Sequence, residues 1–315
     1  YGGSYNMLKV LLPRLGITTT FVDPDDPKNF TDAVQENTRL FFAESLGNPK
    51  LDVLDLKGIS REAKSAKVPF MVDSTLATPA LQNPIAFGVN IVIHSLTKYA
   101  NGNGSTMGGV IIDAGNFDWS SGKFPEFTTP SDGYHGLVLH DVLGPAAYIA
   151  KVRIEGLRDL GAAISPFNAF QIIQGLETLE IRMKKHSENA LALAEWLEAH
   201  EDVAWVNYPG LKSSKYNELA KKYLPEGQSG LLAFGLKGGF DAGKTVADET
   251  KLFALVANFG DSKSLVIHPA STTHQQLTPE EQASTGVTPD LIRLSVGLEN
   301  VEDLKADLQQ AFDKV

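Results

Sequence analysis

The stretches Val68-Pro69-Phe70-Met71-Val72-Asp73-Ser74-Thr75 and Asn90-Ile91-Val92-Ile93-His94-Ser95-Leu96-Thr97-Lys98 decide the fold of this 315-residue chain. Each is a short apolar run that ends in polar residues. Such runs are typical of strands buried on both faces of a parallel sheet. Comparable runs cover residues 40–45 and 109–113, and a helix is expected over residues 55–66. The pattern predicts an α/β fold with a mostly parallel central sheet and helices on both faces, in which functional side chains follow the strand ends.

From residue 114 onward the sequence pattern changes. Residues 114–145 are rich in Gly, Pro, Ser and aromatic residues, and their length predicts a functional or oligomer-contacting loop. Apolar residues at helical spacing then predict one broken helix or two helices over residues 166–199. The later elements expected are strands at 203–206 and 231–234 and helices at 240–255 and 301–312. We therefore expect two domains, a large one over residues 1–200 and a smaller α+β one over residues 201–315.

Composition narrows the class of function. The chain is 43% hydrophobic and 21% charged, as is usual for soluble globular proteins, and its formal net charge is −10. An acidic chain with no apolar run near about 20 residues predicts neither nucleic-acid nor membrane binding. Cysteine is absent and the seven histidines show no metal-ligand spacing, so no metal site is expected. The absence of cysteine is compatible with a reducing compartment, and we expect a cytoplasmic protein.

Asp73 and Lys98 are the two residues most suggestive of chemistry. Lys98 follows an apolar run and the sequence His-Ser-x-Thr, so its amine should be desolvated, with a lowered pKa. Asp73 could simply cap a helix, because Asp-Ser-Thr is a good N-terminal cap sequence. A carboxylate and an amine at neighbouring strand ends also match the needs of pyridoxal phosphate (PLP). That cofactor forms a Schiff base with a lysine and pairs its pyridine nitrogen with an acid.

Three further residues fit a phosphorylated aromatic cofactor. Ser95 and Thr97 alternate around Leu96, so their hydroxyls could bind one phosphate together, although they could also be ordinary turn residues. Tyr1 precedes Gly2 and Gly3, which would let its ring stack closely on a cofactor. The alternative is that these first residues are merely a flexible start.

Arg293 indicates an anionic substrate. It lies between the apolar residues Ile292 and Leu294. A guanidinium in that position could bind a substrate carboxylate, or it could lie at a sheet edge near the surface. The glycine-rich segment 102–109 does not predict a nicotinamide dinucleotide site. It lacks the G-x-G-x-x-G spacing and precedes a strand rather than a helix.

Taken together, these motifs resemble those of the Cys/Met-metabolism PLP-dependent enzymes of fold type I. The segment Pro130–Gly136 is similar to the O-acetylhomoserine sulfhydrylase branch of that family. The matching pieces follow the family's order along the whole chain: Tyr1–Ser4, Glu44–Pro49, Val72–Thr75, His94–Tyr99, Lys263–His274 and Arg293–Glu299. The resemblance implies a PLP-dependent transferase fold with a smaller C-terminal domain.

The resemblance also implies a role for each matching residue. Lys98 would bind PLP covalently and move protons, and Tyr1 would stack on the ring and assist the leaving group. The remaining cofactor contacts would be Asp73 at the pyridinium, Ser95 and Thr97 at the phosphate, and Asn48 beside the phenolic oxygen. Ser264 and Arg293 would hold the substrate carboxylate.

The implied reaction is a γ-replacement in which O-acetylhomoserine reacts with sulfide, or methanethiol, to give homocysteine, or methionine, and acetate. A γ-lyase or a cystathionine γ-synthase on the same fold is the nearest alternative. A non-catalytic truncated protein that only binds partners is an alternative of another class. Family members carry a further segment before the Tyr-Gly-Gly motif, so the N-terminal part of the domain is expected to be missing here. They are commonly homotetramers, built as dimers of dimers.

Overall fold

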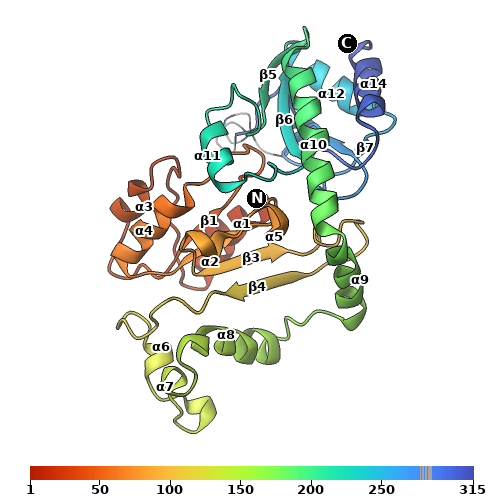
Figure 1. Ribbon diagram of the computed structural model, residues 1–315. Helices are drawn as coiled ribbons and strands as arrows, with labels where there is room; N and C mark the ends of the chain where they lie inside the picture. The colour runs from red at the N-terminus through yellow and green to blue at the C-terminus, as the bar shows by residue number, and fades with distance from the viewer. Residues whose placement is uncertain (277, 279, 281, 283–285) are drawn as a thin grey trace.

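The first sheet carries the strand ends that the sequence singled out (Figure 1). The computed structural model describes residues 1–276, 278, 280, 282 and 286–315. Strands β1 (Phe41–Glu44), β2 (Phe70–Asp73) and β3 (Ile91–Ser95) are adjacent and parallel in a four-stranded sheet of order β1-β2-β3-β4. The predicted α/β class and mostly parallel sheet are therefore confirmed.

Strand β4 (Gly109–Asp113) departs from the expected parallel arrangement, because it runs antiparallel to β3. Residues 96–108, all described, form turns and irregular chain rather than a helix. A parallel return normally needs a crossover helix, whereas a turning connection reverses the strand direction. The apolar run at 109–113 predicted a strand correctly, but it could not specify its direction.

Both faces of this sheet are covered, and by different parts of the chain. Phe70, Val72 and Val92 point into the main core, while Ile91 belongs to a second cluster with Trp119, Phe124, Phe127, Leu139 and Ala147. Neighbouring side chains on a strand point to opposite faces, so β2 and β3 contribute to both clusters. Trp119, Phe124, Phe127 and Leu139 come from the stretch 114–145 that was expected to be a loop.

That stretch and the residues that follow it, up to residue 159, contain short helices and pack on the sheet. Their elements are α6 (Pro125–Thr128), η3 (Asp132–Tyr134), α7 (Leu139–Leu143), η4 (Gly144–Ala146), α8 (Ala147–Lys151) and η5 (Val152–Asp159). The ring of Trp119 stacks on that of Tyr148 at 4.9 Å between centroids. In Figure 1 these helices lie beyond β4, on the side away from the second sheet. Covering the sheet is thus one function of this segment, and its expected role in oligomer contacts stays a prediction.

Short helices precede and separate the parallel strands. They are α1 (Gly2–Asn6), η1 (Met7–Leu11), α2 (Leu12–Arg14), α3 (Lys28–Asp32), α4 (Leu56–Ala66), α5 (Thr78–Leu81) and η2 (Pro84–Phe87). Helix α4 agrees closely with the predicted helix at 55–66 and packs against α3 and β2. It buries Leu56, Ile59 and Ala63, so its apolar face forms part of the main core.

The second sheet is five-stranded, with the order β5-β6-β9-β8-β7. Its strands are β5 (Val203–Asn207), β6 (Leu231–Leu236), β7 (Ala254–Leu255), β8 (Leu265–Ile267) and β9 (Leu291–Ser295), and the accompanying helices are α11 (Asn217–Tyr223), α12 (Gly239–Glu249), η6 (Pro269–Ser271) and α14 (Val301–Phe312). The predicted helix at 301–312 is confirmed. The predicted helix at 240–255 is too long, because α12 ends at Glu249 and the chain continues into β7.

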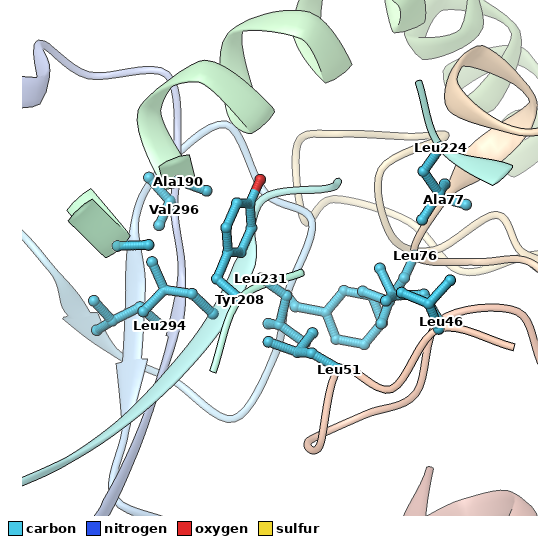
Figure 2. Packing of buried hydrophobic residues seen from close by; sticks show 14 of the residues in the cluster. Leu46, Leu51, Leu76, Ala77, Ala190, Tyr208, Leu224, Leu231, Leu294 and Val296 are labelled. Carbon is cyan, nitrogen blue, oxygen red and sulfur yellow. The ribbon is translucent and has the colours of Figure 1, made fainter. Parts of the chain in front are cut away.

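Two helices connect the sheets. Helix α9 (Pro166–Glu177) and helix α10 (Leu179–Glu198) are separated at Thr178, which resolves the choice between one broken helix and two. Helix α10 runs from beside α9 to the second sheet, where it packs on β5, β6 and α14 (Figure 1). Figure 2 shows part of the resulting core, in which Leu46, Leu76, Ala190 and Leu231 pack in one cluster. The core is thus continuous across residue 200, and the domain boundary there stays a prediction.

None of the helices in the described ranges combines the length and apolar character needed to cross a membrane. Within the same ranges, His, Asp and Glu side chains form no cluster suited to a metal ion.

Candidate active site

The carboxyl ends of β1, β2 and β3 meet at one edge of the first sheet and form a cavity there. The strand register pairs Glu44 with Asp73, and Asp73 with Ile93, so the residues after each strand are neighbours. The cavity lining includes five of the predicted site residues: Tyr1, Asn48, Asp73, Ser95 and Lys98. The structure therefore brings together residues that are up to 97 positions apart in the sequence.

Lys98 extends from the turn after β3, where its backbone N–H donates to the carbonyl of Ser95 at 3.3 Å. Its amine donates to the side-chain oxygen of Asn258 and lies 4.9 Å from the centre of the Phe259 ring. Burial, and secondarily the charge of Arg293, lowers the pKa of the Lys98 amine. A lowered pKa raises the fraction of neutral, nucleophilic amine near neutral pH.

Asp73 is held by the residues that follow it. The N–H and the hydroxyl of Thr75 donate to Asp73 Oδ1 at 2.9 and 2.5 Å. The same hydroxyl accepts from the N–H of Ser95 at 2.8 Å, so Thr75 fixes the end of β2 to the end of β3. The alternative that Asp73 caps a helix is wrong, because the next helix, α5, begins at Thr78.

Arg293 reaches the site from β9 in the second sheet. Its Nη1 donates to Asn48 Oδ1 at 3.0 Å and its Nη2 to the carbonyl of Asn258 at 3.1 Å. Its Nε is buried without a hydrogen-bond partner. Burial lowers the pKa of the guanidinium to about 10, so it remains charged at neutral pH. The ion pairs of the described ranges do not include Arg293, and its charge is available to an anionic ligand.

Thr97 and Ser264 have structural contacts of their own. The Thr97 hydroxyl donates to the carbonyl of Gly108 at 3.3 Å and accepts from its N–H at 3.1 Å. The Ser264 hydroxyl is fully buried, donating to Glu299 at 2.9 Å and accepting from the Gly297 N–H at 2.8 Å. Neither residue lines the cavity as Ser95 does. Their predicted contacts with phosphate and with substrate stay predictions.

The sequence as a whole matches the family model for Cys/Met metabolism PLP-dependent enzymes over residues 1–313. The chain belongs to this family.

Its similarity to individual members is high over almost all of its length. The chain is 52% identical to an O-acetyl-L-homoserine sulfhydrylase of Leptospira meyeri, covering 100% of this chain and 73% of that protein. It is 51% identical to a homocysteine synthase of Schizosaccharomyces pombe, covering 99% and 74%. A crystal structure of a putative O-acetylhomoserine (thiol)-lyase from Campylobacter jejuni matches with a TM-score of 0.95 and 43% identity, covering 99% and 75%. That crystal structure contains N′-pyridoxyl-lysine-5′-monophosphate.

The cavity suits the cofactor of this PLP-dependent family. It contains a lysine amine of lowered pKa, a carboxylate at Asp73 and an aromatic ring at Tyr1. A β-carbon at Gly3 would lie 2.6 Å from the Tyr1 ring, so the chain passes close to that ring. The prediction that the glycines after Tyr1 let its ring stack on a cofactor stays a prediction.

Four residues of the site were not predicted from the sequence. Glu44 lines the cavity and accepts from the Asn48 N–H at 3.1 Å, and burial raises the pKa of its carboxyl. It follows an apolar run just as Asp73 does, so the strand-end argument could have found it. Thr75, Asn258 and Phe259 act through contacts between distant segments, for which the single sequence offers no signal.

Proposed function

We propose that this chain catalyses γ-replacement, converting O-acetylhomoserine and sulfide, or methanethiol, into homocysteine, or methionine, and acetate. The observation that carries the proposal is the cavity lined by Lys98 and Asp73, next to which the Arg293 guanidinium donates to Asn48, another residue of the lining. The relatives described above support the choice of substrate, since they are named as sulfhydrylases and homocysteine synthases that act in this chemistry. The reaction exchanges one bond for another at Cγ: a carbon–oxygen bond to acetate breaks and a carbon–sulfur bond forms.

Asp73 and Lys98 would serve the cofactor. Bound PLP supplies an electron sink that stabilises negative charge next to the substrate's α-carbon. Asp73 would keep a proton on the pyridine nitrogen, and the Thr75 bonds would keep the carboxylate oriented toward it. Ser95 and Thr97 would bind the phosphate, with Asn48 beside the phenolic oxygen. Lys98 would hold the cofactor and later carry protons at its Nζ.

Arg293 would fix the substrate by its α-carboxylate. A planar fork binds a carboxylate with two parallel hydrogen bonds, and so sets its orientation as well as its distance. Because Asn48 and Asn258 hold the guanidinium, the substrate would bind to a group that is already in place. Lys98 Nζ would then take the proton from the α-carbon. Tyr1 would assist departure of acetate, and Ser264 would be a further contact for the carboxylate.

The experiment is a product analysis of the purified protein supplied with PLP, O-acetylhomoserine and sulfide. Homocysteine and acetate should appear in equal amounts, and an absence of homocysteine would refute the proposal. Formation of α-ketobutyrate and ammonia from homocysteine or methionine would instead identify a γ-lyase. A visible absorbance band of lysine-bound PLP that disappears in Lys98→Ala would rule out a protein that only binds partners.

We also propose a homotetramer, arranged as a dimer of dimers, in the cytoplasm. The exposed side chains of Phe167, Phe170 and Ile173 on α9 support an assembly, because they recur three residues apart and are 66%, 57% and 58% exposed. An apolar stripe of this kind is usually covered by another surface. Light scattering coupled to size-exclusion chromatography measures the oligomer, and a monomer at micromolar concentration would contradict it.

A further inference from the structure

Asn258 contacts both cationic groups of the site through different atoms. Its side-chain oxygen accepts from Lys98 Nζ, while its backbone carbonyl accepts from Arg293 Nη2 at 3.1 Å. Asn258 belongs to the segment between β7 and β8, so it comes from the second sheet's part of the chain. One residue thus connects the amine that follows β3 with the guanidinium on β9.

The segment that carries Asn258 is fixed against the backbone of Lys98. At Gly260 the backbone has φ +79°, and a β-carbon there would lie 2.6 Å from the Tyr99 nitrogen and 3.0 Å from the Lys98 carbonyl carbon. The Gly260 N–H donates to Ser295 Oγ at 3.0 Å, and the Ser262 N–H donates to the Gly102 carbonyl at 2.8 Å. The position of Asn258 relative to Lys98 is therefore set by the packing of two backbones.

We propose that Asn258 is a positioning residue for Lys98. Its side-chain oxygen holds the amine at the cavity whenever that amine is not bonded to the cofactor. The inference rests on the proposed function, because it takes Lys98 as the lysine that binds PLP and then moves the proton. An unheld lysine side chain has several free torsions, and holding it removes that freedom before the proton transfer. Phe259 supports the same position, with its ring centre 4.9 Å from Nζ.

Charged groups from several elements surround the Lys98 amine. Burial lowers the pKa of this amine, and so, to a lesser degree, does the charge of Arg293 on β9. Asp73 at the end of β2 and Glu44 at the end of β1 line the same cavity, together with Tyr1. Asn258 is a neutral acceptor among these charges, and it can bond to the amine in its neutral or its protonated form.

The first test measures the Lys98 amine directly in cofactor-free full-length protein. Trace acetylation with isotopically labelled acetic anhydride, quantified at Lys98 by mass spectrometry over a pH series, gives the midpoint of its titration. Asn258→Asp has nearly the same shape but adds a negative charge beside the amine, and should raise the midpoint by about one unit or more. Asn103→Asp, at an exposed position, is the matched control and should leave the midpoint unchanged. Equal midpoints in the two variants would overturn the proposal.

The second test separates positioning of Lys98 from substrate binding in the PLP-loaded enzyme. Asn258→Ala removes the side-chain oxygen but keeps the backbone carbonyl that accepts from Arg293. We expect kcat to fall by about 10- to 100-fold, with KM for O-acetylhomoserine within about two-fold of the wild-type value. Asn103→Ala should change neither. A raised KM with unchanged kcat would assign Asn258 to the carboxylate site and overturn the inference.

The two tests distinguish this inference from the proposed reaction. If the wild-type protein forms no homocysteine, the acetylation profile still reports whether Asn258 holds Lys98. If Asn258→Ala does not fold, as judged by circular dichroism, Asn258→Asp decides the question through the titration midpoint and its own kcat. A changed midpoint supports the inference, and an unchanged one refutes it.

Discussion

Replacing Arg293 tests the substrate clamp most directly. Its two Nη groups are held by Asn48 and Asn258, and its Nε is buried without a partner, so the guanidinium is already oriented before a ligand binds. Two charge-assisted hydrogen bonds to a carboxylate are worth about 1.5–3 kcal/mol each. At about 1.4 kcal/mol for each tenfold, their loss in Arg293→Met should lower kcat/KM for O-acetylhomoserine by roughly 10²- to 10⁴-fold. Arg293→Lys keeps the charge but loses the planar fork, so its kcat/KM should lie between those of Arg293→Met and the wild type.

The assay is steady-state formation of homocysteine, with the absorbance of the bound cofactor recorded for each variant. The absorbance band of the lysine-bound cofactor should persist, which separates a loss of substrate binding from a loss of the cofactor. Arg61 on α4 has a side chain that is 75% exposed, so Arg61→Met and Arg61→Lys are the matched controls and should behave as wild type. An Arg293→Met enzyme that keeps kcat/KM within about three-fold of wild type would refute the reasoning, since a charge-assisted bond cannot be worth so little.

Three further predictions concern single polar contacts. Thr75→Val removes the hydroxyl that donates to Asp73 and accepts from Ser95, and should weaken PLP binding about tenfold in a titration of cofactor-free protein, whereas Thr75→Ser should not. Burial lowers the pKa of His186 to about 4 from 6.5, so folding stability should fall as pH drops from 6.5 toward 4, by up to about 3 kcal/mol. Urea unfolding at several pH values should show this decrease in the free energy of unfolding for the wild type, and a smaller decrease for His186→Asn. The buried Asp307 carboxylate accepts three backbone N–H groups at 2.8, 2.8 and 3.0 Å, so Asp307→Ala should cost about 3–5 kcal/mol in urea unfolding at neutral pH, and a loss under about 1 kcal/mol would contradict this.

Strand ends were the part of the site that the sequence could predict. The apolar runs before Asp73 and Ser95 specify buried parallel strands, and parallel strands end at a common edge. The proximity of Asp73 and Lys98 follows from that rule without knowledge of any contact. The same rule applies to Glu44, which ends β1 and lines the cavity.

The hydrogen-bond partners of the predicted residues could not be obtained in this way. Thr97 and Ser264 are residues of the right type in the right segments, yet their hydroxyls are bonded to Gly108 and to Glu299. Periodicity specifies which side of a strand or turn a residue occupies, but not which distant group will form a hydrogen bond with its side chain. Buried hydroxyls need a partner, and the nearest one depends on the packing of both sheets.

The residues of the site come from two different sheets, so the distances between them depend on how the two sheets pack together. In the first sheet Asp73 ends β2 and Lys98 follows β3, whereas in the second sheet Arg293 is on β9 and Asn258 precedes β8. Gly260 is a point where the two parts meet, because its missing side chain lets one backbone approach the other at Tyr99. In the sequence, that glycine has the appearance of an ordinary turn residue between Phe259 and Asp261. A larger residue there would push the second sheet's segment away from Lys98, and would separate the amine from its acceptor even though every residue of the site remained in place.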